Sequence, residues 1–314
     1  MKKTKILISI YNDWKSVFKL LEEINVQLDG WEAHISVIII NDASTEERPI
    51  NTSLLKNLKS IHIINMKENR GHARCNAAGL KYINENEDFD YIVIMDGDGE
   101  DRPAELGTLL CKSYENPEKV ITANRVKRSE GFFFKFCYSV HKCLTFILAG
   151  QSIKFGNYSC LPKFAVNVIV KEAATWSSFS GSLVKTMKKR TSILSTRGKR
   201  YFGPSKMNFI NLLKHSLSII AVFKTTLLIR SILFLISYLF LVIGSISIIT
   251  LIPVIGVIFV MLSVIILSKR ENMSEFNNSL ENISSIDKIK WKKFILNQIA
   301  FIIGSEWKLA VSIF

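Results

Sequence analysis

Residues 91–101 read Tyr-Ile-Val-Ile-Met-Asp-Gly-Asp-Gly-Glu-Asp, a continuous apolar run followed directly by four acidic residues in six positions. A short run that is apolar at every position predicts a strand buried on both faces, with a turn at its carboxyl end. Four carboxylates in one turn repel each other unless a cation lies among them. Their oxygens suit Mg²⁺ or Mn²⁺ bound together with a phosphate.

The main alternative for such a loop is an EF-hand, which the sequence does not fit. An EF-hand would need a glycine where Asp101 stands and a bidentate glutamate where Gly107 stands, and it would follow a helix. We therefore predict a divalent-metal site with Asp96, Asp98 and Glu100 as its ligands.

Four further apolar runs alternate with segments of helical periodicity, for example Val17, Leu20, Leu21 and Ile24. This alternation predicts an α/β fold, with a Rossmann-like, mostly parallel sheet covered on both faces. The further runs are 5–10, 35–40, 61–66 and 120–123. Polar residues just past such strands line the ligand crevice. Here they are Asn12, Asp13, Asp42, Ser44, Asn69, Gly71, Asp96, Asp98 and Arg125.

Charge and hydropathy divide the chain of 314 residues unevenly. The net charge is +14 and the mean hydropathy is +0.22, yet residues 173–270 contain no acidic residue. This distribution excludes a disordered chain and a uniformly basic nucleic-acid binder. The 38 residues from Ser231 to Ser268 carry no charge, which is too long for one membrane span and suits two.

A membrane hairpin follows from this stretch, with its turn expected among Gly244, Ser245, Ser247 and Pro253. Arg230 before it and Lys269 and Arg270 after it place both ends on the cytoplasmic side. A buried soluble hairpin is the alternative. The predicted division is a catalytic domain (1–205), an amphipathic membrane-surface helix (206–224), two transmembrane helices (225–268) and a cytoplasmic basic, amphipathic tail (269–314).

Other nucleotide-binding signatures are absent from the sequence, which has neither GxGxxG nor GxxxxGK[ST]. Neither a dinucleotide-binding fold nor a P-loop is therefore supported. A phosphate-bearing ligand can be bound without a glycine cradle when a metal neutralises its charge.

Five segments taken in order resemble the motifs of inverting family 2 glycosyltransferases of the GT-A fold. Residues 10–13 (Ile-Tyr-Asn-Asp) are similar to the opening V-x-x-Y-N-E, with Ser9 where proline is common. Residues 41–46 resemble D-D-x-S-x-D, residues 69–73 resemble N-x-G-x-x-x-A, and residues 96–98 match D-x-D. Residues 200–206 (Arg-Tyr-Phe-Gly-Pro-Ser-Lys) fit R-x-x-G-x-S-K of the polyprenyl-phosphate sugar transferases.

The resemblance implies roles for individual residues. Asp42 would bind the nucleobase, Asn12 or Asp13 the nucleoside, and Asp98 would be catalytic. The alternative for Asn12 and Asp13 is that they only cap the next helix. The nucleotide-sugar site would comprise Tyr11, Asn12, Asp13, Asp42, Ser44, Asn69, Gly71, Asp96 and Gly97. The acceptor phosphate, and with it catalysis, would depend on Arg125, Arg200, Ser205 and Lys206.

The expected function is transfer of a sugar from a UDP- or GDP-linked donor to polyprenyl phosphate, with Mg²⁺ or Mn²⁺ as cofactor. The enzyme would be a multi-pass protein of the inner membrane, and its sequence is compatible with a homo-oligomer. A phosphate acceptor needs no general base, which agrees with Glu172 as the only acid between Glu130 and Glu271. His141 is the other candidate base, and the amide of Asn157 stands where an acid could have been.

Two alternatives stay open. One is transfer to a hydroxyl of a lipid-linked saccharide or another glycan. The other is a non-catalytic membrane scaffold that has kept the fold, against which Asp96 and Asp98 argue.

Overall fold

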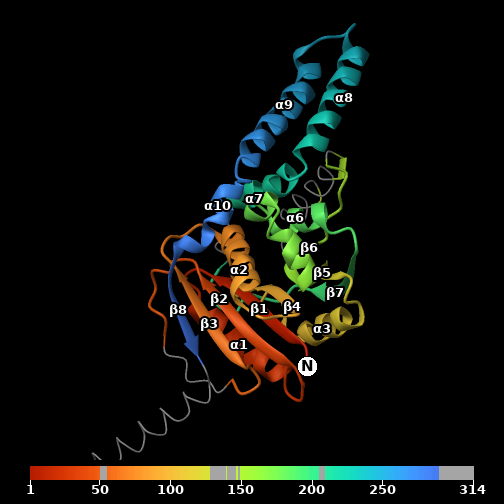
Figure 1. The fold of residues 1–314 in the computed structure, drawn as a ribbon. Helices are drawn as coiled ribbons and strands as arrows, with labels where there is room; N and C mark the ends of the chain where they lie inside the picture. The colour runs from red at the N-terminus through yellow and green to blue at the C-terminus, as the bar shows by residue number, and fades with distance from the viewer. Residues whose placement is uncertain (50–54, 128–138, 140–145, 148, 205–208, 290–314) are drawn as a thin grey trace, which may run out of the picture.

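The computed structural model describes residues 1–49, 55–127, 139, 146–147, 149–204 and 209–289. Its centre is an eight-stranded sheet in the order β7-β5-β6-β4-β1-β2-β3-β8 (Figure 1). The strands are β1 (Lys3–Ile10), β2 (His34–Asn41), β3 (Ser60–Met66), β4 (Tyr91–Asp96), β5 (Val120–Lys127), β6 (Phe155–Pro162), β7 (Arg190–Thr196) and β8 (Ile283–Ile289).

The four central strands, β4, β1, β2 and β3, are parallel to one another. The five strands expected from apolar runs all form, which confirms the mostly parallel α/β fold. The sheet is mixed because β6 runs antiparallel to β4 and β5, and β8 runs antiparallel to β3. Neither of these two strands is a continuous apolar run, so the sequence did not predict them.

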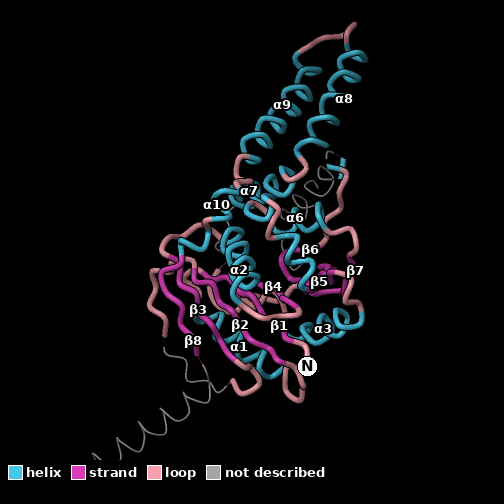
Figure 2. The backbone as a smooth tube through the Cα atoms, viewed as in Figure 1, coloured by secondary structure: helices cyan, strands magenta, loops and turns pink. Residues whose placement is uncertain are grey.

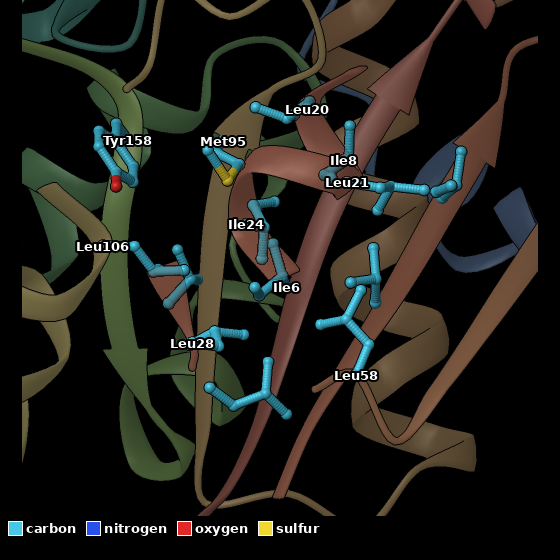
Figure 3. Close-up of a cluster of buried hydrophobic side chains, with 14 of the residues drawn as sticks. Ile6, Ile8, Leu20, Leu21, Ile24, Leu28, Leu58, Met95, Leu106 and Tyr158 are labelled. Atoms are coloured by element: carbon cyan, nitrogen blue, oxygen red, sulfur yellow. The ribbon is translucent and has the colours of Figure 1, made fainter. Parts of the chain in front are cut away.

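Helices cover both faces of the sheet. On one face α1 (Trp14–Gln27) and α3 (Leu106–Glu115) pack on side chains such as Ile6 and Ile8 (Figure 3). On the other face α2 (His72–Asn86), α5 (Lys163–Ile169) and α6 (Phe179–Thr186) pack around Leu7 and its neighbours. Successive residues of β1 thus point to opposite apolar layers, as a doubly covered strand requires.

Three helices then lead away from the sheet. They are α7 (Phe209–Ala221), α8 (Lys224–Val242) and α9 (Ile248–Ser268). In Figure 2, α8 and α9 project together beyond the domain, with α7 at their base. Both are long and apolar enough to cross a membrane, and most of their side chains are exposed, unlike those of a soluble core hairpin.

The turn of the hairpin spans 243–247, as Gly244, Ser245 and Ser247 predict, and Ser247 caps α9. Pro253 does not lie in the turn but inside α9. It is the sixth residue of the helix, beyond the first four N–H groups that have no intrahelical partner, so α9 lacks one backbone hydrogen bond there.

After α9 the chain returns to the sheet through α10 (Met273–Asn277) and ends its described part in β8. The predicted tail therefore includes part of the globular domain. Phe276 of α10 is fully buried and stacks on Trp176 with ring centroids 5.6 Å apart. Trp176 belongs to the short 3-10 helix η2 (Ala173–Trp176); the others are η1 (Pro103–Glu105) and η3 (Ser279–Asn282).

Candidate active site

The carboxyl ends of the parallel strands bring the predicted polar residues to one edge of the sheet. Ser9 of β1 pairs in register with Asp96 of β4, and Ile10 pairs with Asn41 of β2. The loops that carry residues 12–13, 42–44 and 96–98 therefore meet at this edge. The convergence predicted from the strand ends is present in the structure.

A segment from Arg197 to Gly203, here called the covering segment, lies against the acidic loop. Its backbone N–H groups at Gly198 and Tyr201 donate to the carbonyl oxygens of Glu100 (2.8 Å) and Asp98 (2.9 Å). The Tyr201 ring also lies where any side chain at position 99 would stand, and Gly99 has a φ of +88°. The glycine in the acidic loop thus permits this close approach.

Arg200 joins two loops of the predicted site. Its Nη1 donates to Asp98 Oδ2 at 2.9 Å, its Nη2 donates to Asp13 Oδ2, and its Nε donates to the carbonyl of Phe202. The three side chains are only 17–18% exposed. A guanidinium can make this planar, forked contact, whereas a lysine ammonium cannot.

Asn12 and Asp13 do not cap the helix that follows them. Asp13 stands at the N-cap of α1 without a side-chain capping bond. Asn12 has a φ of +51° and connects two loops: its backbone N–H donates to Ser44 Oγ, and its Oδ1 accepts from the N–H of Thr45 at 2.8 Å. A strained backbone held by such contacts is typical of a functional loop.

Asp42 holds the loop before α2. Its two carboxylate oxygens accept backbone N–H groups of Arg70 (2.9 Å) and Gly71 (2.8 Å), and Asn69 donates to its carbonyl. Burial raises the pKa of Asp42, and these hydrogen bonds partly offset the effect. Asn69 and Gly71 therefore lie next to Asp42, as expected for residues of one ligand-binding edge. The contact of Asp42 with a nucleobase stays a prediction.

Asp96 ends β4 and contacts two side chains from other elements. Asn157 of β6 donates to its Oδ1 at 3.0 Å, and Nε2 of His72 lies 3.2 Å from the same oxygen. Burial would raise the pKa of Asp96, but the hydrogen bond with His72 and its charge lower it. Burial would lower the pKa of His72, and the bond with Asp96 raises it.

Arg125 lies beneath the acidic loop, with its guanidinium 3.1 Å from Asp101 and 3.9 Å from Asp96. Asp101 is 2% exposed and also accepts the backbone N–H of Asp96. Burial and the charge of Asp96 raise the pKa of Asp101 to about 7, although Arg125 opposes this. Because its guanidinium lies close to both carboxylates, Arg125 offsets part of their negative charge.

The donor set fits a divalent cation that also takes oxygens from a diphosphate. Asp96 and Asp98 keep 23% and 18% of their side-chain surface exposed. Burial, and to a smaller extent the charge of Asp96, raise the pKa of Asp98 to about 6. Among the described residues, no group of three or more His, Cys, Asp or Glu side chains could hold a metal alone. Mg²⁺ is commonly bound by one or two carboxylates plus substrate phosphates.

The other predicted residues differ in placement. Glu100 is paired with Arg197, whose Nε donates to it at 2.9 Å. Tyr11 is 42% exposed at the same edge, and Gly97 packs against β1. Ser205, Lys206 and His141 lie outside the described residues.

Sequence reasoning did not assign roles to His72, Asp101 or Tyr201. The quoted motifs contain or adjoin them, but their partners come from other strands and loops. The alternation of strands and helices alone could not pair His72 with Asp96.

The fold and this acidic edge define a mostly parallel α/β protein of the GT-A class. The profile of glycosyl transferase family 2 matches residues 5–161, so the chain belongs to that family. A fold neighbour agrees: glucosyl-3-phosphoglycerate synthase from Mycobacterium tuberculosis, in a complex with Mn²⁺, UDP and glucosyl-3-phosphoglycerate, superposes with a TM-score of 0.52. The two chains are 12% identical, over 72% of this chain and 80% of the other.

Curated relatives include undecaprenyl-phosphate 4-deoxy-4-formamido-L-arabinose transferases. That of Proteus mirabilis is 24% identical over 219 residues, and that of Photorhabdus laumondii is 26% identical over 219 residues. Each alignment covers 68% of this chain and 65% of the relative, so the chain spans just under two thirds of their length.

Proposed function

We propose that this protein is a membrane-anchored, inverting glycosyltransferase that moves a sugar from a UDP- or GDP-linked donor to polyprenyl phosphate. One observation carries the proposal. Arg200 lies on the acidic edge of a GT-A sheet, where it pairs with Asp13 and Asp98, and the chain continues from it into two membrane-length apolar helices. The named activity of the undecaprenyl-phosphate relatives supports the same acceptor class.

The donor would occupy the edge between the loops after β1, β2 and β4. Asn12, Asp13 and Asp42 would bind its nucleoside part, and Asp96 and Asp98 would hold a divalent cation with its diphosphate. Mg²⁺ or Mn²⁺ would supply neutralisation of the diphosphate charge that grows as the sugar departs.

The acceptor phosphate would attack the anomeric carbon from the face opposite the diphosphate. A bond forms from a phosphate oxygen to that carbon, the bond to the nucleoside diphosphate breaks, and the configuration inverts. Arg200 and Arg125 would bind the charge of this phosphate, together with Ser205 and Lys206, which lie outside the described residues. Arginine can bind a phosphate through two parallel hydrogen bonds.

No protein base is needed in this reaction, because a phosphate monoester is largely anionic near neutral pH. Glu172, the candidate base, is engaged elsewhere: it accepts the N–H of Ala174 and pairs with Lys185 at 2.9 Å. Asn157 is an amide bound to Asp96 and cannot accept the proton of a hydroxyl.

The membrane location follows from α8 and α9. At 1.5 Å per residue, helices of 19 and 21 residues extend about 28 and 31 Å, close to a hydrocarbon core of about 30 Å. The excess of Lys and Arg beside them favours a cytoplasmic catalytic domain in an inner membrane.

The deciding experiment uses the purified full chain in detergent with polyprenyl phosphate and a panel of UDP- and GDP-sugars. We expect nucleoside-diphosphate release that requires the lipid phosphate, stops in excess EDTA, and is abolished in Asp98→Ala with the fold intact by circular dichroism. Transfer only to a glycan hydroxyl would favour the second acceptor class. Full activity of Asp98→Ala would refute the metal assignment, and no release with any donor would favour a scaffold.

A further inference from the structure

One imidazole contacts the ends of three strands at the candidate active site. His72 is the first residue of α2, and its Nδ1 lies 2.8 Å from Ser9 Oγ of β1. Its Nε2 lies 3.2 Å from Asp96 Oδ1 of β4 and 2.7 Å from Asn157 Nδ2 of β6. The ring therefore bridges Ser9 to Asp96 through its two nitrogens.

The loop of residues 69–71, which precedes His72, holds the backbone that carries this ring. Asp42, buried at 3% exposure, accepts the backbone N–H groups of Arg70 and Gly71. Gly71 has a φ of +88°, which residues with a side chain rarely adopt, and His72 follows it directly. Because two hydrogen bonds hold this turn, the imidazole enters the site at a set angle.

Asn157 completes the arrangement. Its amide nitrogen donates to Asp96 Oδ1 at 3.0 Å and lies 2.7 Å from His72 Nε2. When Nε2 carries the hydrogen that it donates to Asp96, Asn157 donates to Asp96 alone. Two side chains thus meet at Oδ1 of Asp96, whereas Oδ2 lies 3.9 Å from Arg125. These contacts set the orientation of the carboxylate at Oδ1, and the Asp96 side chain keeps 23% of its surface exposed.

We propose that Ser9, His72 and Asn157 are positioning residues that hold Asp96 in the orientation that binds the donor diphosphate and its cation. The inference rests on the proposed function and adds to it the side chains that contact Asp96 directly or through the imidazole of His72. Outer partners of this kind orient carboxylate ligands, and their loss typically weakens metal binding 10- to 100-fold.

The test measures Mn²⁺ binding rather than turnover. Free Mn²⁺ is followed by electron paramagnetic resonance during titration of the purified full chain in detergent, with UDP and separately with GDP present. We expect His72→Ala and Asn157→Leu to weaken Mn²⁺ binding about 10- to 100-fold, and Ser9→Ala about 2- to 10-fold, as for one neutral hydrogen bond.

Two further variants separate positioning from folding. His34→Ala removes an imidazole at the start of β2, away from the acidic edge, and should leave Mn²⁺ binding unchanged. His72→Gln, which retains a polar group for one of the two contacts, should recover part of the lost affinity. Ser9→Ala is small enough to keep the fold, and unchanged thermal unfolding without ligand would confirm this.

The outcomes are distinct. Wild type that binds Mn²⁺ with a nucleotide, together with His72→Ala and Asn157→Leu within twofold of it, would overturn the positioning role alone. Wild type without Mn²⁺ binding in the presence of either nucleotide would refute the metal-dependent transfer and this inference with it.

Discussion

Arg200 contacts residues of the proposed donor site and is also proposed to bind the acceptor phosphate. It is paired with Asp13 and Asp98 in this structure, and it must bind the acceptor phosphate in the proposed reaction. We predict that Arg200→Ala lowers transfer by at least about 100-fold, because charge-assisted contacts to both partners are lost. Arg200→Lys should rescue little, since an ammonium cannot replace the fork.

Initial rates of nucleoside-diphosphate release at saturating donor provide the measurement. The control is Arg48→Ala, which removes an exposed arginine that pairs with Asp287 of the edge strand β8 and, within the described part of the chain, has no hydrogen bond or ion pair with Asp13, Asp98 or Arg200. Transfer by Arg200→Ala at the rate of this control would remove Arg200 from the site.

Glu172 tests the nature of the acceptor. Its carboxylate caps η2 and pairs with Lys185, so neither bond leads to the acidic edge. We predict that Glu172→Gln keeps transfer within about twofold, because an amide oxygen can still accept the capping N–H. Loss of several orders of magnitude in rate, with donor binding retained, would indicate a general base and a hydroxyl acceptor instead.

A second polar cluster, Lys5, His62 and Glu87, makes stability depend on pH. Burial would raise the pKa of Glu87, but the hydrogen bond with Lys5 (2.6 Å) and its charge lower it. Burial lowers the pKa of His62, and Glu87 only partly offsets this. A carboxyl whose pKa is lowered in the folded state stabilises the protein at pH values above its unfolded pKa of about 4.3. This stabilisation is lost as the pH falls through the folded pKa.

We therefore predict that the melting temperature of wild type exceeds that of Glu87→Gln by about 3–10 °C near pH 7. The difference should shrink as the pH falls below about 4.3 and close only below the lowered folded pKa of Glu87, where this carboxyl is protonated in both states. His62 also lowers the stability of wild type as the pH falls below about 6.5. The cause is its lowered folded pKa, because the imidazole then binds a proton more readily in the unfolded state. Thermal unfolding at a series of pH values checks this, and parallel curves for the two proteins would contradict it.

At the scale of elements, the strands that could be predicted from the sequence are the ones formed by a continuous apolar run. The runs of β1 to β5 are apolar at successive positions, and their ends fall within a few residues of the structure. β6 and β8 include Gly, Asn, Ser or Asp and are partly exposed, so no period identifies them. Their pairing is also non-local, as with Ile61 and Ile289. The sequence predicted at which edge of the sheet the site lies. It could not predict which side chains contact each other there, because partners such as Asn157 arrive through the pairing of β6.

Helix α10 shows how the chain beyond the hairpin contributes to the domain. Phe276 is fully buried against Trp176, and Glu275 accepts from the indole nitrogen at 2.9 Å and pairs with Arg74 of α2. We predict that Phe276→Ala lowers the free energy of unfolding by about 3–5 kcal/mol, through lost burial and the cavity it leaves.

The control is Phe164→Ala, which truncates a phenylalanine that is 45% exposed on α5 and should cost much less. Urea unfolding in detergent, followed by tryptophan fluorescence, compares the two. Equal losses for both variants would show that α10 does not stabilise the domain.

At the scale of the whole molecule, the two ends of the α8–α9 hairpin both connect to one domain. The chain before α8 and the chain after α9 belong to the same sheet, because β8 pairs with β3 from Ile61–Ile289 to Met66–Ile283. If α8 and α9 both cross, the catalytic domain and β8 must share one compartment (Figure 1). The basic flanks, with Arg230 before the charge-free stretch and Lys269 and Arg270 after it, favour the cytoplasm.

This arrangement makes a labelling prediction with an internal control. Cys111 of α3 is exposed and should lie inside, whereas Ser245 in the hairpin turn should lie outside. In spheroplasts, a membrane-impermeant maleimide should label Ser245→Cys strongly and wild type not at all. After permeabilisation wild type should label through Cys111. Labelling of wild type before permeabilisation would place the catalytic domain outside. Failure of Ser245→Cys to label would mean that the turn does not reach the far side, since a thiol exposed there reacts readily as thiolate.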